Sequence, residues 1–179
     1  MFFTHLFAAV LLLLSVVPAT ATEGTRLGNQ FPDFTMTEYE GLTSGSQKQL
    51  SDFRGVVVLN FWTYRCAPCI KEFPEFRRLR EIFKDEKRLH ILPVLTKSYP
   101  EVGIPWGRSL GYSGPLFNAR QLRNEGVALA EVGFPQNYIV INDGAGRTVA
   151  YFFAGALPWS NSEYVRYLRE LIARLPVAE

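Results

Sequence analysis

The fold is decided by the stretch Val56-Val57-Val58-Leu59-Asn60-Phe61-Trp62-Thr63-Tyr64-Arg65-Cys66-Ala67-Pro68-Cys69. Its first half is mostly apolar and rich in β-branched residues, which is typical of a strand buried on both faces. After the second cysteine, apolar residues recur at three- and four-residue steps, as on one face of a helix: Ile70, Phe73, Phe76, Leu79 and Phe83. We therefore predict a central strand over 56–62 and a helix that begins at the two cysteines.

The start of a helix changes the chemistry of a cysteine. Unpaired N–H groups and the positive end of the helix dipole stabilise a thiolate there, and Arg65 adds a cation beside Cys66. A fall in thiol pKa from about 8.5 to about 7 requires about 2 kcal/mol and leaves about half of the thiol ionised at neutral pH. The spacing places both sulfurs on one face of the helix, close enough for a disulfide. We predict that Cys66 attacks a substrate disulfide, and that Cys69, one turn deeper, resolves the mixed disulfide that forms.

Length and charge limit the class of protein. A chain of 179 residues, 47% of them hydrophobic, can bury the core of one domain. The formal net charge is only +2, and no run of like charges suggests a nucleic-acid partner. We expect one domain that acts as a monomer and binds no nucleic acid.

The first residues have the pattern of an export signal. An apolar stretch over Leu6–Val17 is too short for a comfortable membrane span and is followed by Ala19-Thr20-Ala21, an A-x-A cleavage pattern. We predict a signal peptide over residues 1–21, a domain over residues 22–179, and a periplasmic or secreted location. No Lys or Arg precedes Leu6, so an uncleaved membrane anchor stays open.

Two other roles for the cysteines are a structural disulfide and a metal site. In an oxidising compartment, Cys66 and Cys69 could form a structural disulfide, although closing so short a loop constrains the unfolded chain little. A metal site is not expected, because His90 is the only histidine beyond the predicted signal peptide and lies in a predicted strand over 89–95. We also expect no cofactor.

The rest of the chain predicts an α/β fold with a mixed sheet. Residues 28–55 read as an irregular extension, and strands at 138–141 and 148–153 flank turn residues typical of a hairpin. Helices are predicted over 118–131 and after the capping box Ser160-Asn161-Ser162-Glu163. Residues 97–115, rich in Gly, Pro and aromatic residues, predict no element. With the cysteine-bearing helix, this pattern places helices on both faces of the sheet.

Glu72 follows Cys69 by three residues, so a helix carries it on the same face as the sulfurs. A carboxylate in that position can hold or shuttle the proton of Cys69. From spacing alone, a solvated glutamate among neighbouring charges is an equally good interpretation.

Taken in order, the strand, the C-x-x-C pair and a later proline before a hairpin resemble the thioredoxin superfamily. More closely, the chain resembles the exported thiol–disulfide oxidoreductases of the TlpA/ResA type. The matching stretches are Phe31–Phe34, Leu50–Gly55, Val57–Trp62, Cys66–Cys69, Glu72–Pro74 and Val132–Pro135. The resemblance implies a thioredoxin-like fold with an N-terminal extension, and exchange of disulfides with protein thiols and disulfides.

The resemblance also assigns roles to single residues. Pro135 takes the position of a cis-proline beside the active-site disulfide, where the backbone of Phe134 would pair with a substrate chain. Glu72 matches an active-site glutamate. Arg65 replaces the tryptophan that usually precedes the first cysteine, so the partner surface, to which we assign Arg65 and Trp62, must differ from that of the family.

Two other functions stay open. Thr63-Tyr64-Arg65-Cys66 is the T-x-x-C pattern of peroxiredoxins, although Leu59 stands where their motif has proline, so a thiol peroxidase is one alternative. The other is a redox-inert module that binds an extended chain beside Pro135. We expect a reductant rather than an oxidant, and in an oxidising compartment a reductant needs a membrane electron donor. The sequence itself reveals neither the substrate, nor the direction of electron flow, nor that donor.

Overall fold

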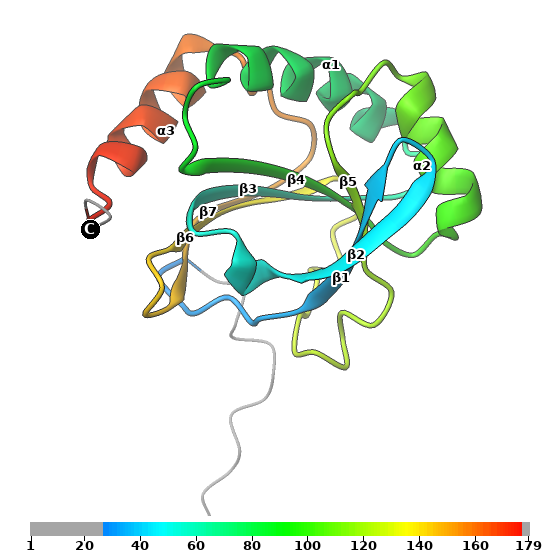
Figure 1. The fold of residues 1–179 in the computed structure, drawn as a ribbon, viewed down its shortest axis with the longest axis horizontal. Helices are drawn as coiled ribbons and strands as arrows, with labels where there is room; N and C mark the ends of the chain where they lie inside the picture. The colour runs from blue at the N-terminus through cyan, green and yellow to red at the C-terminus, as the bar shows by residue number, and fades with distance from the viewer. Residues whose placement is uncertain (1–26, 177–179) are drawn as a thin grey trace, which may run out of the picture.

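The computed structural model describes residues 27–176, so the signal peptide predicted over residues 1–21 lies outside the described part. The strands are β1 (Thr35–Glu40), β2 (Thr43–Gln49), β3 (Gly55–Trp62), β4 (Leu89–Leu95), β5 (Leu116–Asn118), β6 (Gln136–Asn142) and β7 (Arg147–Ala154) (Figure 1). The helices are α1 (Ala67–Ile82), α2 (Pro100–Ser109) and α3 (Ser162–Ala173), and a 3-10 turn, η1 (Leu50–Asp52), precedes β3. Within residues 27–176, no helix combines the length and the apolar character needed to cross a membrane.

The sheet has the strand order β2-β1-β5-β4-β3-β6-β7. Strands β3, β4 and β5 are parallel, whereas β6 runs antiparallel to β3 and forms the predicted hairpin with β7. All residues of β3 are buried, which confirms the predicted central strand. The register aligns Trp62 with Leu95 and Leu95 with Asn118, so the three parallel strands end together at one edge of the sheet.

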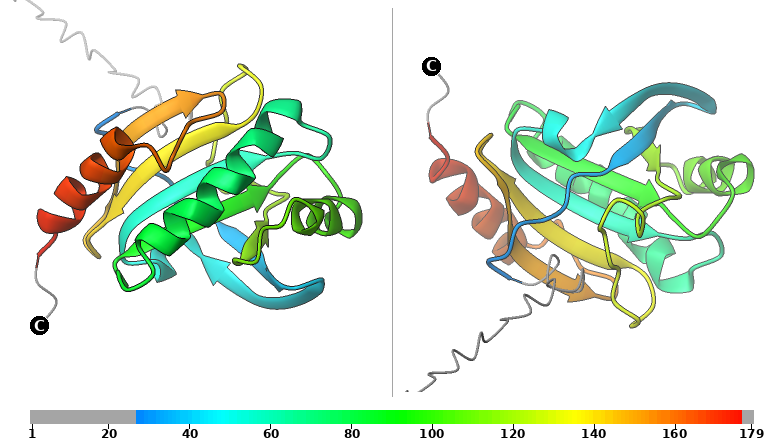
Figure 2. Two further views of the ribbon diagram at one scale, coloured as in Figure 1. Left: turned by 90° about the horizontal axis from the view of Figure 1, so that it is seen from above. Right: turned by 90° about the horizontal axis from the view of Figure 1, so that it is seen from below.

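The sheet separates two hydrophobic layers. The even-numbered apolar residues of β3 pack with residues of α1, α2 and α3, and the odd-numbered ones pack in the other layer. The three α-helices therefore lie on one face (Figure 2). On the other face, the N-terminal extension crosses the sheet and buries Phe31 and Phe34, whose rings lie 6.5 and 5.8 Å from that of Phe61.

The thioredoxin-like fold class and the mixed sheet agree with the expectation, but the cover of the second face needs a correction. No helix forms over 118–131: β5 ends at Asn118, and turns follow, one of them closed by the Val127 N–H donating to the Leu122 carbonyl. The buried anchors Leu122 and Val127 are five residues apart, which does not suit one helix face, and Gly126 has a φ of +82°. On this face the sheet is therefore covered by η1 and these turns instead of an α-helix.

Helix α2 lies in the segment where no element was predicted. Pro100 occupies its first turn, where a missing N–H costs nothing. Gly103 and Gly107 face the sheet: a Cβ on Gly103 would lie 2.3 Å from the side chain of Leu95, and one on Gly107 would lie 3.1 Å from that of Trp62. The glycines that obscure the helix in the sequence therefore allow its close packing.

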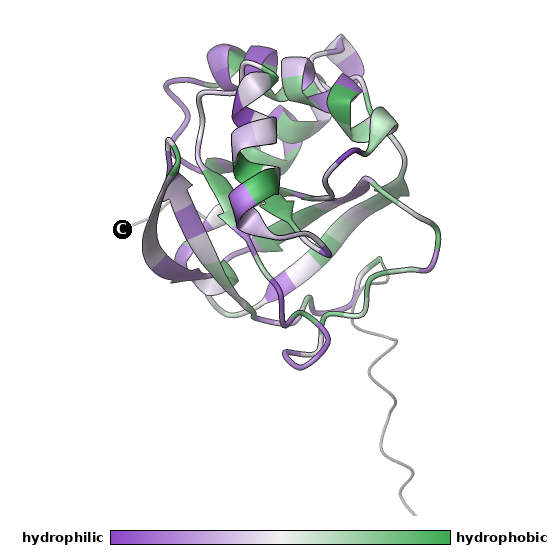
Figure 3. Ribbon diagram, turned by 90° about the vertical axis from the view of Figure 1, so that its right-hand side faces the viewer, coloured by the Kyte–Doolittle hydropathy of each residue, from purple (hydrophilic) through white to green (hydrophobic). Residues whose placement is uncertain are grey.

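Hydropathy follows the layers, with hydrophobic residues gathered in the inner strands and hydrophilic residues at the periphery (Figure 3). Strand β2 is an edge strand that pairs with β1 and is almost entirely exposed. Because its sequence has no alternation of apolar and polar residues, the sequence predicts it only as part of the irregular extension over 28–55. Pairing with β1, rather than burial, defines this strand.

Gly55, at the start of β3, should tolerate no side chain. Its φ is +124°, and a Cβ would lie 2.2 Å from the carbonyl oxygen of Arg88. We expect Gly55→Ala to lower the free energy of unfolding by about 3 kcal/mol or more, because the backbone must both strain and move. The control Gly41→Ala, with a φ of +61° and nothing within 4 Å, should cost only about 1–2 kcal/mol. Urea unfolding measures both, and equal losses would contradict a role for the Arg88 contact.

Candidate active site

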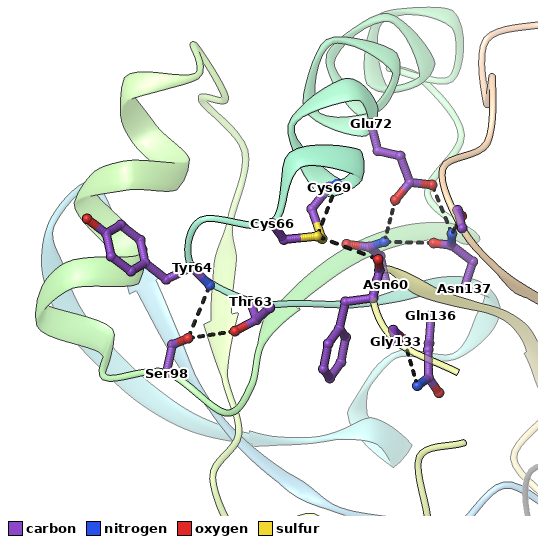
Figure 4. Close-up of a disulfide and its surroundings, with 12 residues drawn as sticks. Asn60, Thr63, Tyr64, Cys66, Cys69, Glu72, Ser98, Gly133, Gln136 and Asn137 are labelled. Carbon is purple, nitrogen blue, oxygen red and sulfur yellow. Dashed lines mark hydrogen bonds between the residues drawn. A yellow bond between two sulfur atoms is a disulfide. The ribbon is translucent and has the colours of Figure 1, made fainter. Parts of the chain in front are cut away.

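Cys66 and Cys69 lie where β3 passes into α1, at the edge where the parallel strands end (Figure 4). They form a disulfide with a Cα–Cα distance of 5.2 Å. Cys66 is the N-cap of α1, and its Sγ accepts a hydrogen bond from the backbone N–H of Cys69 at 3.2 Å. Cys66 is half-buried, whereas Cys69 is only 1% exposed. Cys66 is therefore the accessible sulfur, at a helix start that favours a thiolate.

A cis peptide bond joins Phe134 to Pro135 and lies beside the disulfide. The carbonyl oxygen of Phe134 is 3.6 Å from Cys66 Sγ, within reach of an S–H donor once the pair is reduced. Strand β6 begins at the next residue, Gln136, and pairs with β3. The structure therefore brings Pro135, which follows Cys69 by 66 residues, beside the disulfide, where the resemblance implied it.

Glu72 is buried under the first turns of α1 and is 1% exposed, so it is not a solvated charge. Its Oε2 accepts a hydrogen bond from Asn60 Nδ2 at 2.9 Å. Its Oε1 accepts three: from Asn137 Nδ2 at 2.9 Å, from the backbone N–H of Leu157 at 2.9 Å, and from Trp159 Nε1 at 3.0 Å. Figure 4 shows the two asparagines facing the carboxylate from the sheet.

Burial raises the pKa of Glu72 to about 7, although the four donors favour the ionised carboxylate. The surrounding amides are themselves fixed, since Asn60 Nδ2 also donates to Asn137 Oδ1 at 2.7 Å and Asn137 Nδ2 to the Gly155 carbonyl at 2.9 Å. Glu72 is thus a carboxyl group that changes charge near neutral pH, one helical turn from Cys69.

Asn60 and Asn137 were missed by the sequence reasoning. Both are buried in central strands, at 1% and 0% exposure. The signal was present in the sequence, because Asn60 interrupts an apolar run, and a buried amide requires hydrogen-bond partners. What the sequence does not contain is the identity of that partner, Glu72.

Two cations lie on aromatic rings beside the disulfide. The guanidinium carbon of Arg65 is 5.2 Å from the centroid of the Tyr64 ring, and Lys97 Nζ is 5.3 Å from that of the Phe134 ring. Both Arg65 and Lys97 are exposed. Arg65 directly precedes Cys66 in the chain, and Phe134 carries the carbonyl oxygen that is 3.6 Å from Cys66 Sγ, so both cations rest on the rings of residues that neighbour the disulfide.

Trp62 requires a correction, since it does not reach the surface. It is 0% exposed, and its ring packs against those of Phe73 and Trp106, with centroids 5.1 and 6.0 Å away. As an even-numbered residue of β3, it points into the helical layer. Trp62 therefore supports the site from beneath and presents no exposed surface.

Metal ligands are sparse in the part of the chain that the structure describes, where no three His, Cys, Asp or Glu side chains lie close enough to hold a metal ion. His90 lies near the start of β4, at the opposite end of that strand from the disulfide, and burial lowers its pKa. Its Nε2 is 2.9 Å from the carbonyl oxygen of Arg54.

Sequence comparisons match less than half of the chain. A sequence model of the AhpC/TSA family matches residues 27–103. The thiol-disulfide oxidoreductase ResA of Geobacillus kaustophilus is 37% identical over 87 residues, which are 44% of this chain and 48% of that protein. The thioredoxin-like protein YneN of Bacillus subtilis is 36% identical over 64 residues, 35% of each chain. The chain thus spans about half the length, or less, of the curated relatives it matches.

Structural comparisons cover more of the chain. A candidate protein disulfide isomerase from Bacteroides thetaiotaomicron aligns with a TM-score of 0.67 and 23% identity over 84% of this chain and 92% of that one. A secreted thiol-disulfide isomerase from Corynebacterium glutamicum aligns with a TM-score of 0.60 and 19% identity over 79% and 83%. These similarities establish the fold. The chain therefore has the thioredoxin-like fold, and 44% of its length is similar to the ResA thiol–disulfide oxidoreductase of Geobacillus kaustophilus, in agreement with its sequence pattern.

Proposed function

We propose that this protein is a thiol–disulfide oxidoreductase that exchanges disulfides with protein substrates through Cys66 and Cys69. The observation that carries the proposal is the position of the disulfide, with Cys66 at the start of α1 and 3.6 Å from the carbonyl oxygen before cis-Pro135. The helix start favours a Cys66 thiolate. The similarity to ResA, over 44% of this chain, supports the same activity.

In the reduced protein, the Cys66 thiolate attacks one sulfur of a substrate disulfide. A Cys66–substrate disulfide forms, and the other substrate sulfur leaves with the electron pair and takes up a proton. The Cys69 thiolate then attacks Cys66 Sγ, which restores the Cys66–Cys69 disulfide and releases the first substrate sulfur. The substrate gains two electrons and the cysteine pair loses two, so each turnover requires a dithiol donor to reduce the pair again.

Glu72 is assigned to the proton of Cys69. A buried thiol is a weak nucleophile until its proton is removed. Glu72 lies one turn further along α1, and with a pKa of about 7 it is partly ionised at neutral pH and can accept that proton. Phe134 and Pro135 are assigned to substrate docking, in which an extended substrate chain pairs with the backbone of Phe134.

The proposed direction is reduction, and the proposed place of action is outside the cytoplasm. Support comes from the signal peptide predicted over residues 1–21, which would leave residues 22–179 as the mature domain, and from the resemblance to exported relatives. One structural neighbour is described as secreted. A membrane-bound electron donor would then reduce the Cys66–Cys69 pair again.

A thiol peroxidase is the second candidate, favoured by the AhpC/TSA match and by the T-x-x-C pattern that ends at Cys66. In that reaction, the Cys66 thiolate attacks a peroxide oxygen, and the resulting sulfenic acid condenses with Cys69 to a disulfide and water. The cis-Pro135 junction has no part in this chemistry, which places disulfide exchange first. Peroxide consumption that needs Cys66, without any dithiol exchange, would reverse that order.

Removing the resolving thiol should trap the proposed intermediate. We expect Cys69→Ser to accumulate mixed disulfides through Cys66 with exported proteins, because nothing then attacks the Cys66–substrate bond. Non-reducing electrophoresis with mass spectrometry detects these adducts. The matched variant Cys66→Ser should form far fewer, and a Cys69→Ser protein without adducts would contradict the mechanism.

The direction of electron flow is tested by the reduction potential. We expect the Cys66–Cys69 pair to equilibrate well below about −220 mV, near the range of thioredoxin, as a reductant requires. Thiol trapping after equilibration in graded dithiothreitol buffers measures it. A value near about −120 mV would instead indicate an oxidant that inserts disulfides into unfolded chains.

The role of Glu72 is tested by the pH profile of the resolving step. In the wild type, the rate at which Cys69 releases a trapped substrate should rise with pH through about 7, as Glu72 ionises and becomes a base. Glu72→Gln should remove this limb and slow release at pH 7 by about 100-fold. Rapid-quench kinetics on preformed mixed disulfides measures the step.

The control is Glu75→Gln, one turn further along α1. Burial opposes the ionisation of Glu75, but hydrogen bonds from Ser160 and the neighbouring Arg78 hold its pKa below the ordinary value. The Glu75→Gln substitution should therefore leave the limb of the pH profile unchanged. A Glu72→Gln profile that keeps the limb would rule out Glu72 as the base.

Because the pKa of Glu72 is raised by folding, the wild type should also lose about 3 kcal/mol of unfolding free energy as pH rises from about 4.5 to about 7.

A further inference from the structure

A groove of about 840 Å³ opens on the face of the sheet opposite the α-helices. Its apolar lining includes Leu122 and Val127, which are buried, and the half-buried Leu129 and Phe152. The groove adjoins the ends of β4 and β5, since residues 96–97 and 120 follow those strands. In open sheets with parallel strands, ligands bind outside these carboxyl ends.

The rim of the groove is positively charged. Lys97, Arg120 and Arg123 stand there against a single carboxylate, that of Glu131, and all four side chains are exposed. Within residues 27–176, none of the three cations pairs with a carboxylate within 4.0 Å. Arg120 instead lies 4.9 Å above the ring of Tyr99. The rim thus offers positive charge that the described part of the chain does not neutralise.

The groove is continuous with the site around Cys66. Lys97, on its rim, lies over the ring of Phe134, whose carbonyl oxygen is 3.6 Å from Cys66 Sγ. The groove wall at 128–131 leads directly into Phe134. The side chain of buried Gln136 fixes this wall: Nε2 donates to the carbonyls of Ala130 and Gly133 at 2.6 and 3.0 Å, and Oε1 accepts from the Ala130 N–H at 3.0 Å.

We propose that this groove binds the segment of a protein substrate next to its reactive disulfide, and that it selects segments carrying carboxylates beside apolar side chains. The inference rests on the proposed disulfide exchange at Cys66. A chain docked at Phe134 continues along the wall into the groove, where its apolar side chains cover the floor. Its carboxylates then meet Arg120 and Arg123 at the rim. Charge complementarity of this kind mainly speeds association and rejects basic partners.

The test uses two short synthetic peptides that contain the same internal disulfide and the same apolar residues. One carries Asp and Glu beside the disulfide, and the other carries Asn and Gln at those positions. We expect the reduced wild-type protein to react with the acidic peptide with a second-order rate constant about 3- to 10-fold higher at low ionic strength, and this ratio should fall as salt is added.

The double variant Arg120→Gln/Arg123→Gln should bring the ratio close to one. The matched control is Lys87→Gln/Arg166→Gln, which also removes two exposed cations but lies before β4 and on α3, away from the groove. It should keep the wild-type ratio. Equal rates for the two peptides with the wild type, or a ratio unchanged in the Arg120/Arg123 variant, would overturn the proposed selection.

A neutral small disulfide, bis(2-hydroxyethyl) disulfide, separates this inference from the function on which it rests. If the wild type reduces this compound, and reduces the two peptides at equal rates, disulfide exchange stands and acidic selection fails. If the wild type reduces none of the three, the proposed function fails and the inference fails with it. A second copy of the chain in the groove would slow both peptides equally as protein concentration rises, which also overturns the proposal.

Discussion

The parallel ladders of β3 with β4 and of β4 with β5 align Trp62, Leu95 and Asn118 across the sheet. Because these strands end in register, the loops that follow them meet at one edge. Ser98 accepts a hydrogen bond from the Tyr64 N–H and lies 2.7 Å from the Thr63 hydroxyl, which ties the two loops together. Cys66, Lys97 and Arg120 all follow from this one alignment, although they come from different parts of the chain. The ladder therefore sets the positions both of the disulfide and of the two cations that follow β4 and β5.

Burial of Glu72 is the second constraint, and it connects elements that the ladder does not. Its carboxylate joins α1 to β3 through Asn60, to β6 through Asn137, and to the segment before α3 through Leu157 and Trp159. Burial raises the pKa of the carboxylate, and a buried carboxylate also requires hydrogen-bond donors, which these residues supply. A group well placed to move a proton is thus also a group on which the packing of the C-terminal segment depends.

The sequence predicted those features that a local pattern or a family motif carries. The apolar run of β3, the helix after Cys66 and the β6–β7 hairpin are encoded by neighbouring residues, and the position of Pro135 came from the resemblance. Features that depend on distant packing were missed or wrong. Gly103 and Gly107 hid α2, because their value lies in contact with the sheet, and the inward direction of Trp62 follows from its parity along β3. The groove rim escaped prediction because Lys97 and Arg120 are brought together by the end of the ladder.

The hydrogen bonds of Gln136 to Ala130 and Gly133 have a kinetic consequence. Loops that recognise extended chains are commonly ordered only when a partner arrives, and the lost conformational entropy then weakens binding. Here that entropy is lost once, during folding, because one buried amide holds the segment between the groove and Phe134. An incoming chain has to order only itself. Encounter with many different unfolded or flexible partners could then be brief and fast, which would suit the proposed disulfide exchange, in which each partner is released after one reaction.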